Sequence, residues 1–269
     1  MTETFVQITY DDRGGHDNRG SGGRVATVTI NRPEKLNALN RAVLDALIAA
    51  WATLRLDDAL RVVILRGAGE RAFVGGADIR ELGALNPVAA EAFITAVHHA
   101  CDGARRLPVP VIARIRGHVL GAGLELAAAC DMRVSDTSGV FGMPEVKIGL
   151  PSVVEAAILP QLIGWGRTRQ LLLTGENIDA RKAERWGLIE ELVEPDDLDA
   201  AVERLVNPIL ASGPRAVRQQ KALISDWEDL SLRGAIKKGI DYLADAYRTD
   251  EPTRMVAHTI AALDARKKR

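Results

Sequence analysis

Two glutamates in apolar surroundings are the residues with the clearest capacity for chemistry in this sequence. Glu125 follows a glycine-rich turn within Gly-Ala-Gly-Leu-Glu-Leu, and Glu145 follows a proline within Phe-Gly-Met-Pro-Glu. A carboxylate flanked by leucines and alanines is unfavourable to bury unless it faces a cavity, and burial raises its pKa. A glutamate in the first turn of a helix is often only a partner of the helix dipole, so Glu125 alone leaves that alternative open. The second carboxylate favours an acid/base site.

Glycine-rich turns provide the second ingredient of such a site. An apolar β-type run over residues 109–115 leads into a glycine-rich turn, and strong helix formers follow. We expect a strand, a tight turn and a buried helix there. The first amides of a helix have no intrahelical acceptor, and Gly121 and Gly123 let a ligand approach them, so the turn can hold an anion or a carbonyl oxygen. Gly75-Gly76-Ala77-Asp78 offers a second set of amides, although that stretch alone is equally typical of an ordinary strand-to-helix turn.

The composition argues against several classes of protein. With 35 basic and 36 acidic residues among 269, the net charge is about neutral, unlike that of a nucleic-acid-binding or strongly charged membrane-binding surface. The first residues lack the features of a signal peptide, and no uncharged run reaches transmembrane length. Cys101 and Cys130 lie in apolar stretches without metal-ligand spacing, as is typical of reduced core residues. We expect a soluble cytoplasmic protein that binds neither nucleic acid nor membrane.

Strand and helix patterns alternate in the first part of the chain. The patterns predict strands over residues 5–10, 25–30 and 62–65, and helices over residues 40–51 and 87–106. Asn40 is placed to cap the first of these helices. The repetition predicts an α/β fold with a partly parallel sheet built from βα units.

Three other features of this part have structural interpretations. Residues 11–24 are polar and glycine-rich, which predicts a long mobile hairpin loop with an exposed His16. Residues 67–72 formally match a dinucleotide-binding fingerprint, but no helix opens there. His98 and His99 fall on a helix with no carboxylate or cysteine at ligand spacing, so we interpret both as structural.

The sequence becomes mainly helical after Glu145. Helices are predicted to start at residues 150 and 165 and to cover 180–186, 198–210, 214–226, 232–247 and 252–268, with an extended piece over 188–193.

Four motifs occur together in one order along the chain. They are Asn31-Arg32-Pro33 with Asn37-Ala38-Leu39, the stretch Ala72-Phe73-Val74-Gly75-Gly76-Ala77-Asp78-Ile79, the stretch from Gly117 to Asp131, and Met143-Pro144-Glu145. In this order and spacing, the chain resembles the crotonase, or enoyl-CoA hydratase/isomerase, family from Val25 to about Lys221. As a set these motifs are highly specific.

The resemblance implies an architecture. It implies an α/β fold with a crotonase-like ββα spiral core and acyl-CoA site over residues 1–197, and a C-terminal helical trimerisation region over residues 198–269. A homotrimer is expected, or a hexamer that is a dimer of trimers.

The resemblance also implies the residues of an acyl-CoA site. Glu125 and Glu145 match the two catalytic glutamates of the hydratases. The backbone N–H groups of Ala77 and Ala122 match an oxyanion hole for a thioester carbonyl. The substrate and CoA contacts that it implies are Lys35, Ala38, Ala77, Asp78, Ile79, Arg80 and Gly121, with Lys35 and Ala38 near the nucleotide.

The chemistry of these residues agrees with the resemblance. Addition of water to a conjugated thioester passes through an enolate-like state, whose oxygen is stabilised by two amide donors. One carboxylate takes a proton from water, the other group supplies one to the α-carbon, and two acids in a dry site share a single proton. We expect hydration of a trans-2-enoyl-CoA to the 3-hydroxyacyl-CoA, with no metal and no cofactor beyond the coenzyme A of the substrate.

Other interpretations stay open at this point. Isomerisation, hydrolysis or decarboxylation of an acyl-CoA uses a similar enolate, and a non-catalytic acyl-CoA-binding trimer has the same fold. Where many hydratases have a glycine-rich turn, this chain has Pro151-Ser152-Val153-Val154-Glu155, which adds a third carboxylate near the acyl pocket. A serine hydrolase is disfavoured because the chain has no Gly-x-Ser-x-Gly elbow and Ser152 has no evident histidine partner.

Overall fold

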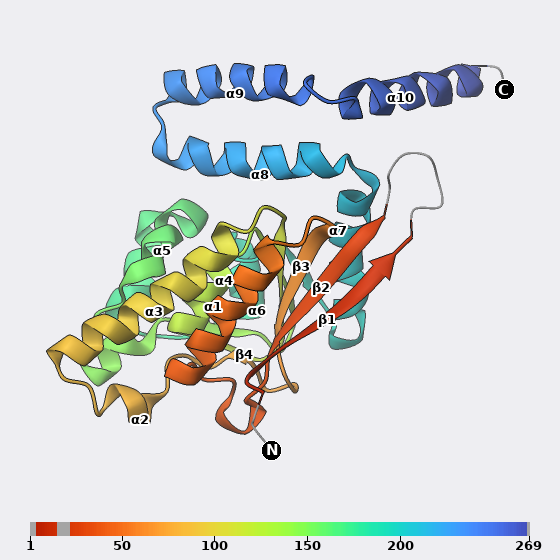
Figure 1. The fold of residues 1–269 in the computed structure, drawn as a ribbon. Helices are drawn as coiled ribbons and strands as arrows, with labels where there is room; N and C mark the ends of the chain where they lie inside the picture. Colours follow the sequence, from red (N-terminus) through yellow and green to blue (C-terminus); the bar gives the residue numbers. More distant parts are fainter. Residues whose placement is uncertain (1–3, 15–21, 268–269) are drawn as a thin grey trace.

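Two β-sheets form the framework of the computed structural model, which describes residues 4–14 and 22–267 (Figure 1). The larger sheet has the strand order β1-β2-β3-β5-β7-β10. Its strands are β1 (Val6–Arg13), β2 (Gly23–Ile30), β3 (Leu60–Gly67), β5 (Val111–Ile115), β7 (Met132–Asp136) and β10 (Glu191–Val193). Only β1 and β2 pair antiparallel among them, and the other pairs are parallel. The inner strands β3 and β5 are therefore nearly continuous apolar runs, as expected when both faces of a parallel sheet are covered.

The smaller sheet has the order β4-β6-β8-β9. Its strands are β4 (Ala72–Val74), β6 (His118–Leu120), β8 (Val140–Gly142) and β9 (Ile178–Asp179). β4, β6 and β8 are parallel, and each follows a strand of the larger sheet along the chain: β3 leads to β4, β5 to β6, and β7 to β8. Helical segments follow each of these strand pairs. The chain thus winds through repeated ββα turns, which confirms the predicted spiral core.

Helices and short 3₁₀ turns connect the strands and cover the sheets. They are α1 (Arg41–Arg55), α2 (Ile79–Leu82), α3 (Pro87–Arg105), α4 (Ala122–Ala128), α5 (Leu159–Thr174) and α6 (Ala180–Trp186), with short 3₁₀ turns η1 (Pro33–Lys35), η2 (Pro144–Ile148), η3 (Val154–Ile158) and η4 (Pro195–Asp197). The side chain of Asn40 accepts a hydrogen bond from the Val43 amide, so α1 is capped as predicted. Fully buried Trp51 of α1 donates through Nε1 to the carbonyl oxygen of Ala100 at 2.8 Å, which fastens α1 to α3.

The C-terminal helices differ in how they contact the rest of the chain. α7 (Leu198–Ala211) packs on the larger sheet, where Leu198, Val202 and Val206 join a buried cluster with residues of β2, β3, β5 and β7. α8 (Pro214–Asp229) lies beyond the sheet, and α9 (Leu232–Ala246) and α10 (Glu251–Lys267) run end to end on its outer side (Figure 1). α9 has no buried residue. The predicted domain boundary between residues 197 and 198 stays a prediction. α7, which follows this boundary, packs into the core of the larger sheet, whereas α8 to α10 do not.

Two predicted elements are wrong in detail. The turn expected after residues 109–115 contains a further strand, β6, which pairs with β4 and β8 and has a buried Val119. The helix expected from residue 150 begins only at Val154, as the 3₁₀ turn η3, since the backbone of Val153 is extended. The helix predicted to start at residue 165 is confirmed, because Gly164 has a non-helical backbone (φ 77°, ψ 157°) that divides α5 into two helical pieces.

The predicted loop over residues 11–24 is shorter than expected. β1 continues to Arg13 and β2 starts at Gly23, with the register Arg13 to Gly23. Residues 15–21, and His16 with them, lie outside the described residues. In the part of the chain that is described, no helix combines the length and apolar character needed to cross a membrane.

Candidate active site

Neighbouring strands of the smaller sheet bring the two glycine-rich turns together. β4 and β6 are parallel neighbours, so the segments that follow them leave the sheet at the same edge. A Cβ added to Gly76 would lie 3.2 Å from the carbonyl oxygen of Leu120, and one added to Gly123 would lie 2.1 Å from that of Val74. Glycine at these two positions therefore permits the close approach of the turns.

Two backbone amides are placed at this edge. Leu39 N donates to Gly76 O and Asp78 N donates to Leu39 O, both at 2.8 Å, and neither bond uses the amide of Ala77. Ala122 is the first residue of α4, where an amide has no intrahelical acceptor. Both residues line the same cavity. Their role as an oxyanion hole stays a prediction.

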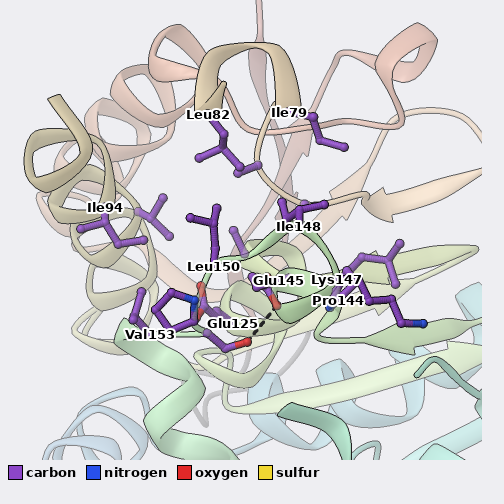
Figure 2. Close-up of a pocket in the computed structure, with 18 of the residues that line it drawn as sticks. Ile79, Leu82, Ile94, Glu125, Pro144, Glu145, Lys147, Ile148, Leu150 and Val153 are labelled. Carbon is purple, nitrogen blue, oxygen red and sulfur yellow. Dashed lines mark hydrogen bonds between the residues drawn. The ribbon is translucent and has the colours of Figure 1, made fainter. Parts of the chain in front are cut away.

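A cavity of about 250 Å³ opens beside these amides (Figure 2). α2 and α3 form one part of its wall, and η2 with the segment that follows it forms another. The wall is mainly apolar, through Ile79, Leu82, Phe93, Ile94, Val97, Leu120, Ile148, Leu150 and Val153. Glu125 and Glu145 also line the cavity, and Figure 2 shows them across it from Leu82. The two predicted acids thus share one small apolar cavity.

Glu125 is buried in the first turn of α4, with an exposed fraction of 3%. Its Oε1 accepts a hydrogen bond from the Ala156 amide at 3.3 Å. Burial, followed by the charge of Glu145, raises the pKa of Glu125 to about 8, and the charge of Glu155 acts in the same direction. The carboxyl group is therefore protonated at neutral pH, as the apolar flanks of this residue predicted.

Glu145 is held by groups from two other segments. It lies in η2, directly after Pro144. Ser152 Oγ donates a hydrogen bond to its Oε2 at 2.8 Å. A Cβ added to Gly121 would lie 2.2 Å from its Oε1, so the carboxylate lies against the Gly121 backbone. Sequence reasoning tested Ser152 only as a nucleophile, and the structure makes it the donor that orients Glu145.

A second, more open pocket adjoins the cavity. The two share Gly75, Ala77 and Ile79. The sequence-predicted residues in the second pocket are Lys35, Ala38, Ala77, Asp78, Ile79 and Arg80, and Gly121 lines the first. All the predicted substrate and CoA contacts therefore lie on one continuous surface.

The charged side chains of the second pocket are unevenly paired. Arg32 Nη1 donates to Asp78 Oδ2 at 2.7 Å, and this hydrogen bond lowers the pKa of Asp78. Lys35 and Arg80 form no ion pair within the described part of the chain. Two cations are thus available for an anionic group at this end of the site.

Comparison with known proteins gives the same answer as the motifs. The sequence model of the enoyl-CoA hydratase/isomerase family matches residues 20–254. The chain belongs to this family. The short-chain-enoyl-CoA hydratase of Clostridium acetobutylicum is 35% identical over 230 residues, which cover 85% of this chain and 88% of that enzyme. The crotonyl-CoA hydratase of Syntrophomonas wolfei is 34% identical over 225 residues, which cover 83% and 85%.

Solved structures extend the likeness to the whole chain. The crystal structure of an enoyl-CoA hydratase from Bacillus anthracis aligns with a TM-score of 0.83 at 30% identity and covers 97% of this chain and 96% of that one. The ββα spiral and the helical C-terminal region are therefore those of the enoyl-CoA hydratase/isomerase family.

His98 of this chain lies beside the site, although the residues around His98 in the sequence gave no sign of a partner. Its Nδ1 lies 2.7 Å from Oε1 of Glu155, which is 57 residues away in the sequence. Ile94 lines the cavity, and His98 lies four residues later on α3, so helical spacing places the two on the same side of the helix. The same spacing is the sequence signal that places His98 near the site.

Among the described residues, no group of three or more His, Cys, Asp or Glu side chains is arranged to hold a metal ion. Cys101 and Cys130 are buried and free, as predicted. Burial raises the pKa of Cys130 to about 12 and also raises that of Cys101, so both stay thiols.

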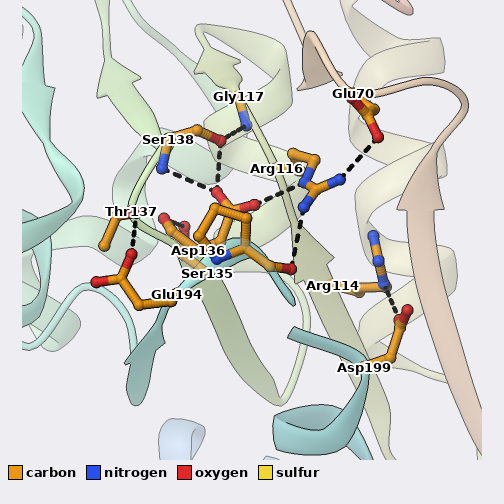
Figure 3. Close-up of polar contacts among 11 residues, drawn as sticks. Glu70, Arg114, Arg116, Gly117, Ser135, Asp136, Thr137, Ser138, Glu194 and Asp199 are labelled. Atoms are coloured by element: carbon orange, nitrogen blue, oxygen red, sulfur yellow. Dashed lines mark hydrogen bonds and ion pairs between the residues drawn. The ribbon is translucent and has the colours of Figure 1, made fainter. Parts of the chain in front are cut away.

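A buried network fixes the turn that leads to this site in the enoyl-CoA hydratase/isomerase fold (Figure 3). Asp136, which is fully buried, accepts hydrogen bonds from Arg116 Nε at 2.7 Å and Ser138 N at 2.9 Å, and also from Ser138 Oγ. Ser138 Oγ accepts in turn from Gly117 N at 3.1 Å. These bonds tie the end of β7 to the turn between β5 and β6, and β6 leads directly to Gly121.

We expect Asp136→Asn to destabilise the fold by about 2–4 kcal/mol, because it leaves the Arg116 guanidinium without its buried counter-charge. Glu70→Gln is the matched control. Glu70 accepts from Nη1 of the same guanidinium at 3.0 Å, but its side chain is 82% exposed, so its loss is expected to cost less than about 1 kcal/mol. Urea unfolding measures both free energies. Equal losses of unfolding free energy in the two variants would show that the buried contact of Arg116 with Asp136 stabilises the fold no more than the exposed contact with Glu70.

Proposed function

We propose that this protein is an enoyl-CoA hydratase, which adds water to a trans-2-enoyl-CoA and releases the 3-hydroxyacyl-CoA. The observation that carries the proposal is the placement of Glu125 and Glu145 in one apolar cavity that Ala77 and Ala122 also line. The relatives named as short-chain-enoyl-CoA and crotonyl-CoA hydratases support it. A double bond isomerase manages with one carboxylate base, whereas this site has two.

The amides of Ala77 and Ala122 act on the thioester oxygen in this mechanism. The water oxygen bonds to the β-carbon, and the electron pair of the double bond moves through the α-carbon toward the carbonyl, which becomes an enolate. Two preorganised N–H donors stabilise the new negative charge, and loss of one such donor typically costs about 3 kcal/mol of barrier. Because both donors are backbone groups, among substitutions at these two positions only one to proline removes the N–H itself.

The two glutamates move the protons. One carboxylate takes a proton from the attacking water, and the other carboxyl group delivers a proton to the α-carbon, so the enolate collapses to the saturated thioester. The pair holds one proton before and after the reaction, and the number of protons is conserved. Ser152 holds Glu145 in place for this exchange, and the Ala156 amide holds Glu125.

The second pocket takes the coenzyme A part of the substrate. Lys35 and Arg80 lie at its surface without acidic partners among the described side chains, which suits the phosphate groups of the nucleotide. Ala38 and Asp78 line this pocket, and Ile79 lines both the pocket and the cavity. No metal and no further cofactor has a part in this mechanism.

Crotonyl-CoA and purified protein provide the test of function. Hydration removes the absorbance of the conjugated thioester, and the product is 3-hydroxybutyryl-CoA. Release of free coenzyme A without loss of conjugation would instead identify a hydrolase. A panel of short, medium and aromatic enoyl-CoAs without any turnover, but with binding, would identify a non-catalytic acyl-CoA-binding protein and overturn the proposal.

The shared proton sets an expected pH dependence. The pKa of Glu125 is raised to about 8, so the pair loses its proton as the pH rises through this value. We expect kcat for hydration to be nearly constant from about pH 6.5 to 7.5 and to fall about tenfold per pH unit above the pKa. Stopped-flow or steady-state rates across this range measure it. A rate that rises through pH 8 would contradict a required proton on the pair.

The same proposal includes a homotrimer or a hexamer in the cytoplasm. Exposed apolar side chains lie on α9, on α10 and at Tyr247 between them; those on the helices are Leu232, Ile236, Ile240, Leu243, Val256, Ile260 and Leu263. This many exposed large apolar side chains favours burial against other copies of the chain. Light scattering distinguishes three or six times the chain mass of 29.1 kDa from a single chain.

A further inference from the structure

Glu155 is a buried acid that the hydration mechanism does not use. It lies in η3 with an exposed fraction of 4%, and its Oε1 contacts His98 Nδ1 at 2.7 Å. Its other oxygen, Oε2, is buried and has no hydrogen-bond partner among the described residues. A buried carboxylate is unfavourable for stability unless it is paired and fully satisfied, so a purely structural role explains this arrangement poorly.

The residue after Glu155 supplies a backbone hydrogen bond to Glu125, and the Val153 backbone also acts on this carboxyl group. Ala156 N donates to Glu125 Oε1 at 3.3 Å, and this bond is long enough to be sensitive to small movements. η3 is held against α3 by the contact of Glu155 with His98. Ser152, which lies just before η3 in the sequence, contacts Glu145. One short segment, residues 152–156, therefore contacts both glutamates of the site and is fastened to α3 through His98.

We propose that His98 and Glu155 are positioning residues for Glu125, and that their hydrogen bond holds the Ala156 amide against the Glu125 carboxyl group. This inference rests on the proposed hydratase function for its kinetic readout. His98 and Glu155 do not line the cavity, so they act through η3 and through charge, without touching the substrate. Pro151-Ser152-Val153-Val154-Glu155 is the segment that departs from the glycine-rich turn of many hydratases, and the contact of Glu155 with His98 gives this segment a function.

The charges around the pair determine the sign of its effects. Glu155 is influenced by His98, Arg105 and Asp102 of α3, and burial raises its pKa. Glu125 of α4 is influenced by Glu145 and by Glu155 itself. The thiol of Cys101 lies within the influence of both Glu155 and Glu125 and stays neutral. The part of α5 that follows η3 directly, Leu159 to Gly166, carries no charged side chain.

Two substitutions are expected to move the titration of Glu125 in opposite directions. The hydrogen bond from the Ala156 amide favours the ionised form of Glu125. His98→Ala releases η3 and weakens this bond, so the pKa of Glu125 rises. Glu155→Gln keeps an oxygen that accepts from His98 but removes a negative charge near Glu125, so the pKa of Glu125 falls. We expect the alkaline limb of the kcat profile to shift by about half a pH unit up in the first variant and down in the second.

The rates provide a second readout. His98→Ala and Glu155→Ala are expected to lower kcat about tenfold and to change KM less than about twofold, because a displaced acid slows proton transfer without altering the cavity wall. His98→Asn retains a nitrogen donor near the position of Nδ1 and is expected to recover most of the rate. His99→Ala is the matched control, since His99 neighbours His98 on α3 with a ring separation of 5.7 Å and has no contact with Glu155.

An infrared titration makes the test independent of turnover. The carboxyl band of protonated Glu125 is identified by its absence in Glu125→Gln, and its midpoint is followed with pH in each variant. Shifts of opposite sign in His98→Ala and Glu155→Gln, with none in His99→Ala, support the inference even if crotonyl-CoA is not the substrate. Identical midpoints in all variants that fold would overturn it, as would a fall in kcat that His99→Ala reproduces.

Discussion

Glu125→Gln and Glu145→Gln are each expected to lower kcat for hydration of crotonyl-CoA about 10³-fold. Each substitution replaces a carboxyl group of similar shape by an amide that neither accepts nor supplies the proton. The loss is large in both variants because one group must take a proton from water while the other gives one to the α-carbon. The two losses are not additive, since one missing member already stops the exchange. The double variant should therefore be only slightly slower than either single one.

Binding and folding provide the controls for this result. Dissociation constants for a saturated acyl-CoA are expected to stay within about threefold, because neither carboxyl group is needed to hold the thioester. Glu91→Gln replaces an exposed acid on α3, away from both predicted pockets of the substrate, and is expected to leave the rate unchanged. Near-normal hydration by either active-site variant would show that the mechanism does not use two carboxylates.

The fold was largely predictable from local patterns. Strands such as β2 and β3 are apolar runs bounded by polar or glycine-rich residues, and α1 has both a cap at Asn40 and an apolar face. The smaller sheet was not predictable, since β4, β6 and β8 have three residues each and β9 has two. Strands of this length carry too few residues to show an alternation, and only pairing with their neighbours defines them.

The acids of the site were predictable from chemistry, and the groups that hold them were not. Glu125 and Glu145 stand out because charges rarely lie among leucine, alanine, phenylalanine and methionine without a reason. Ser152 and His98 are ordinary polar residues in the sequence, and their partners are identified only by contacts across the fold. The position of His98 near the site could be inferred from helical spacing, because Ile94, four residues earlier on the same helix, lines the cavity. The position of its partner Glu155 could not be inferred in this way, since η3 has no periodic pattern.

Gly121 is expected to be nearly as important for catalysis as Glu125 and Glu145. Gly121 has φ +51° and ψ −123°, a conformation that residues with a Cβ rarely adopt, and an added Cβ would lie 2.2 Å from Glu145 Oε1. Alanine at this position therefore strains the backbone before α4 by about 1–3 kcal/mol and displaces the carboxylate. The backbone strain also turns the Ala122 amide, because Ala122 is the next residue in the chain.

We expect Gly121→Ala to lower kcat for hydration about 10²-fold while the protein still folds, since a shift of about 1 Å in a reacting group has an effect of this size. Gly187→Ala is the matched control. Gly187 has φ +78°, but the nearest atom to its added Cβ is an oxygen at 3.6 Å, and it ends α6 outside both pockets. Alanine at this position also has to take a positive φ, in the left-handed helical region, but it displaces no acid, so the rate of Gly187→Ala should match that of the wild type. Equal rate losses in the two variants would attribute the effect to general destabilisation, whereas a loss confined to Gly121→Ala locates it at the Glu145 carboxylate and the Ala122 amide.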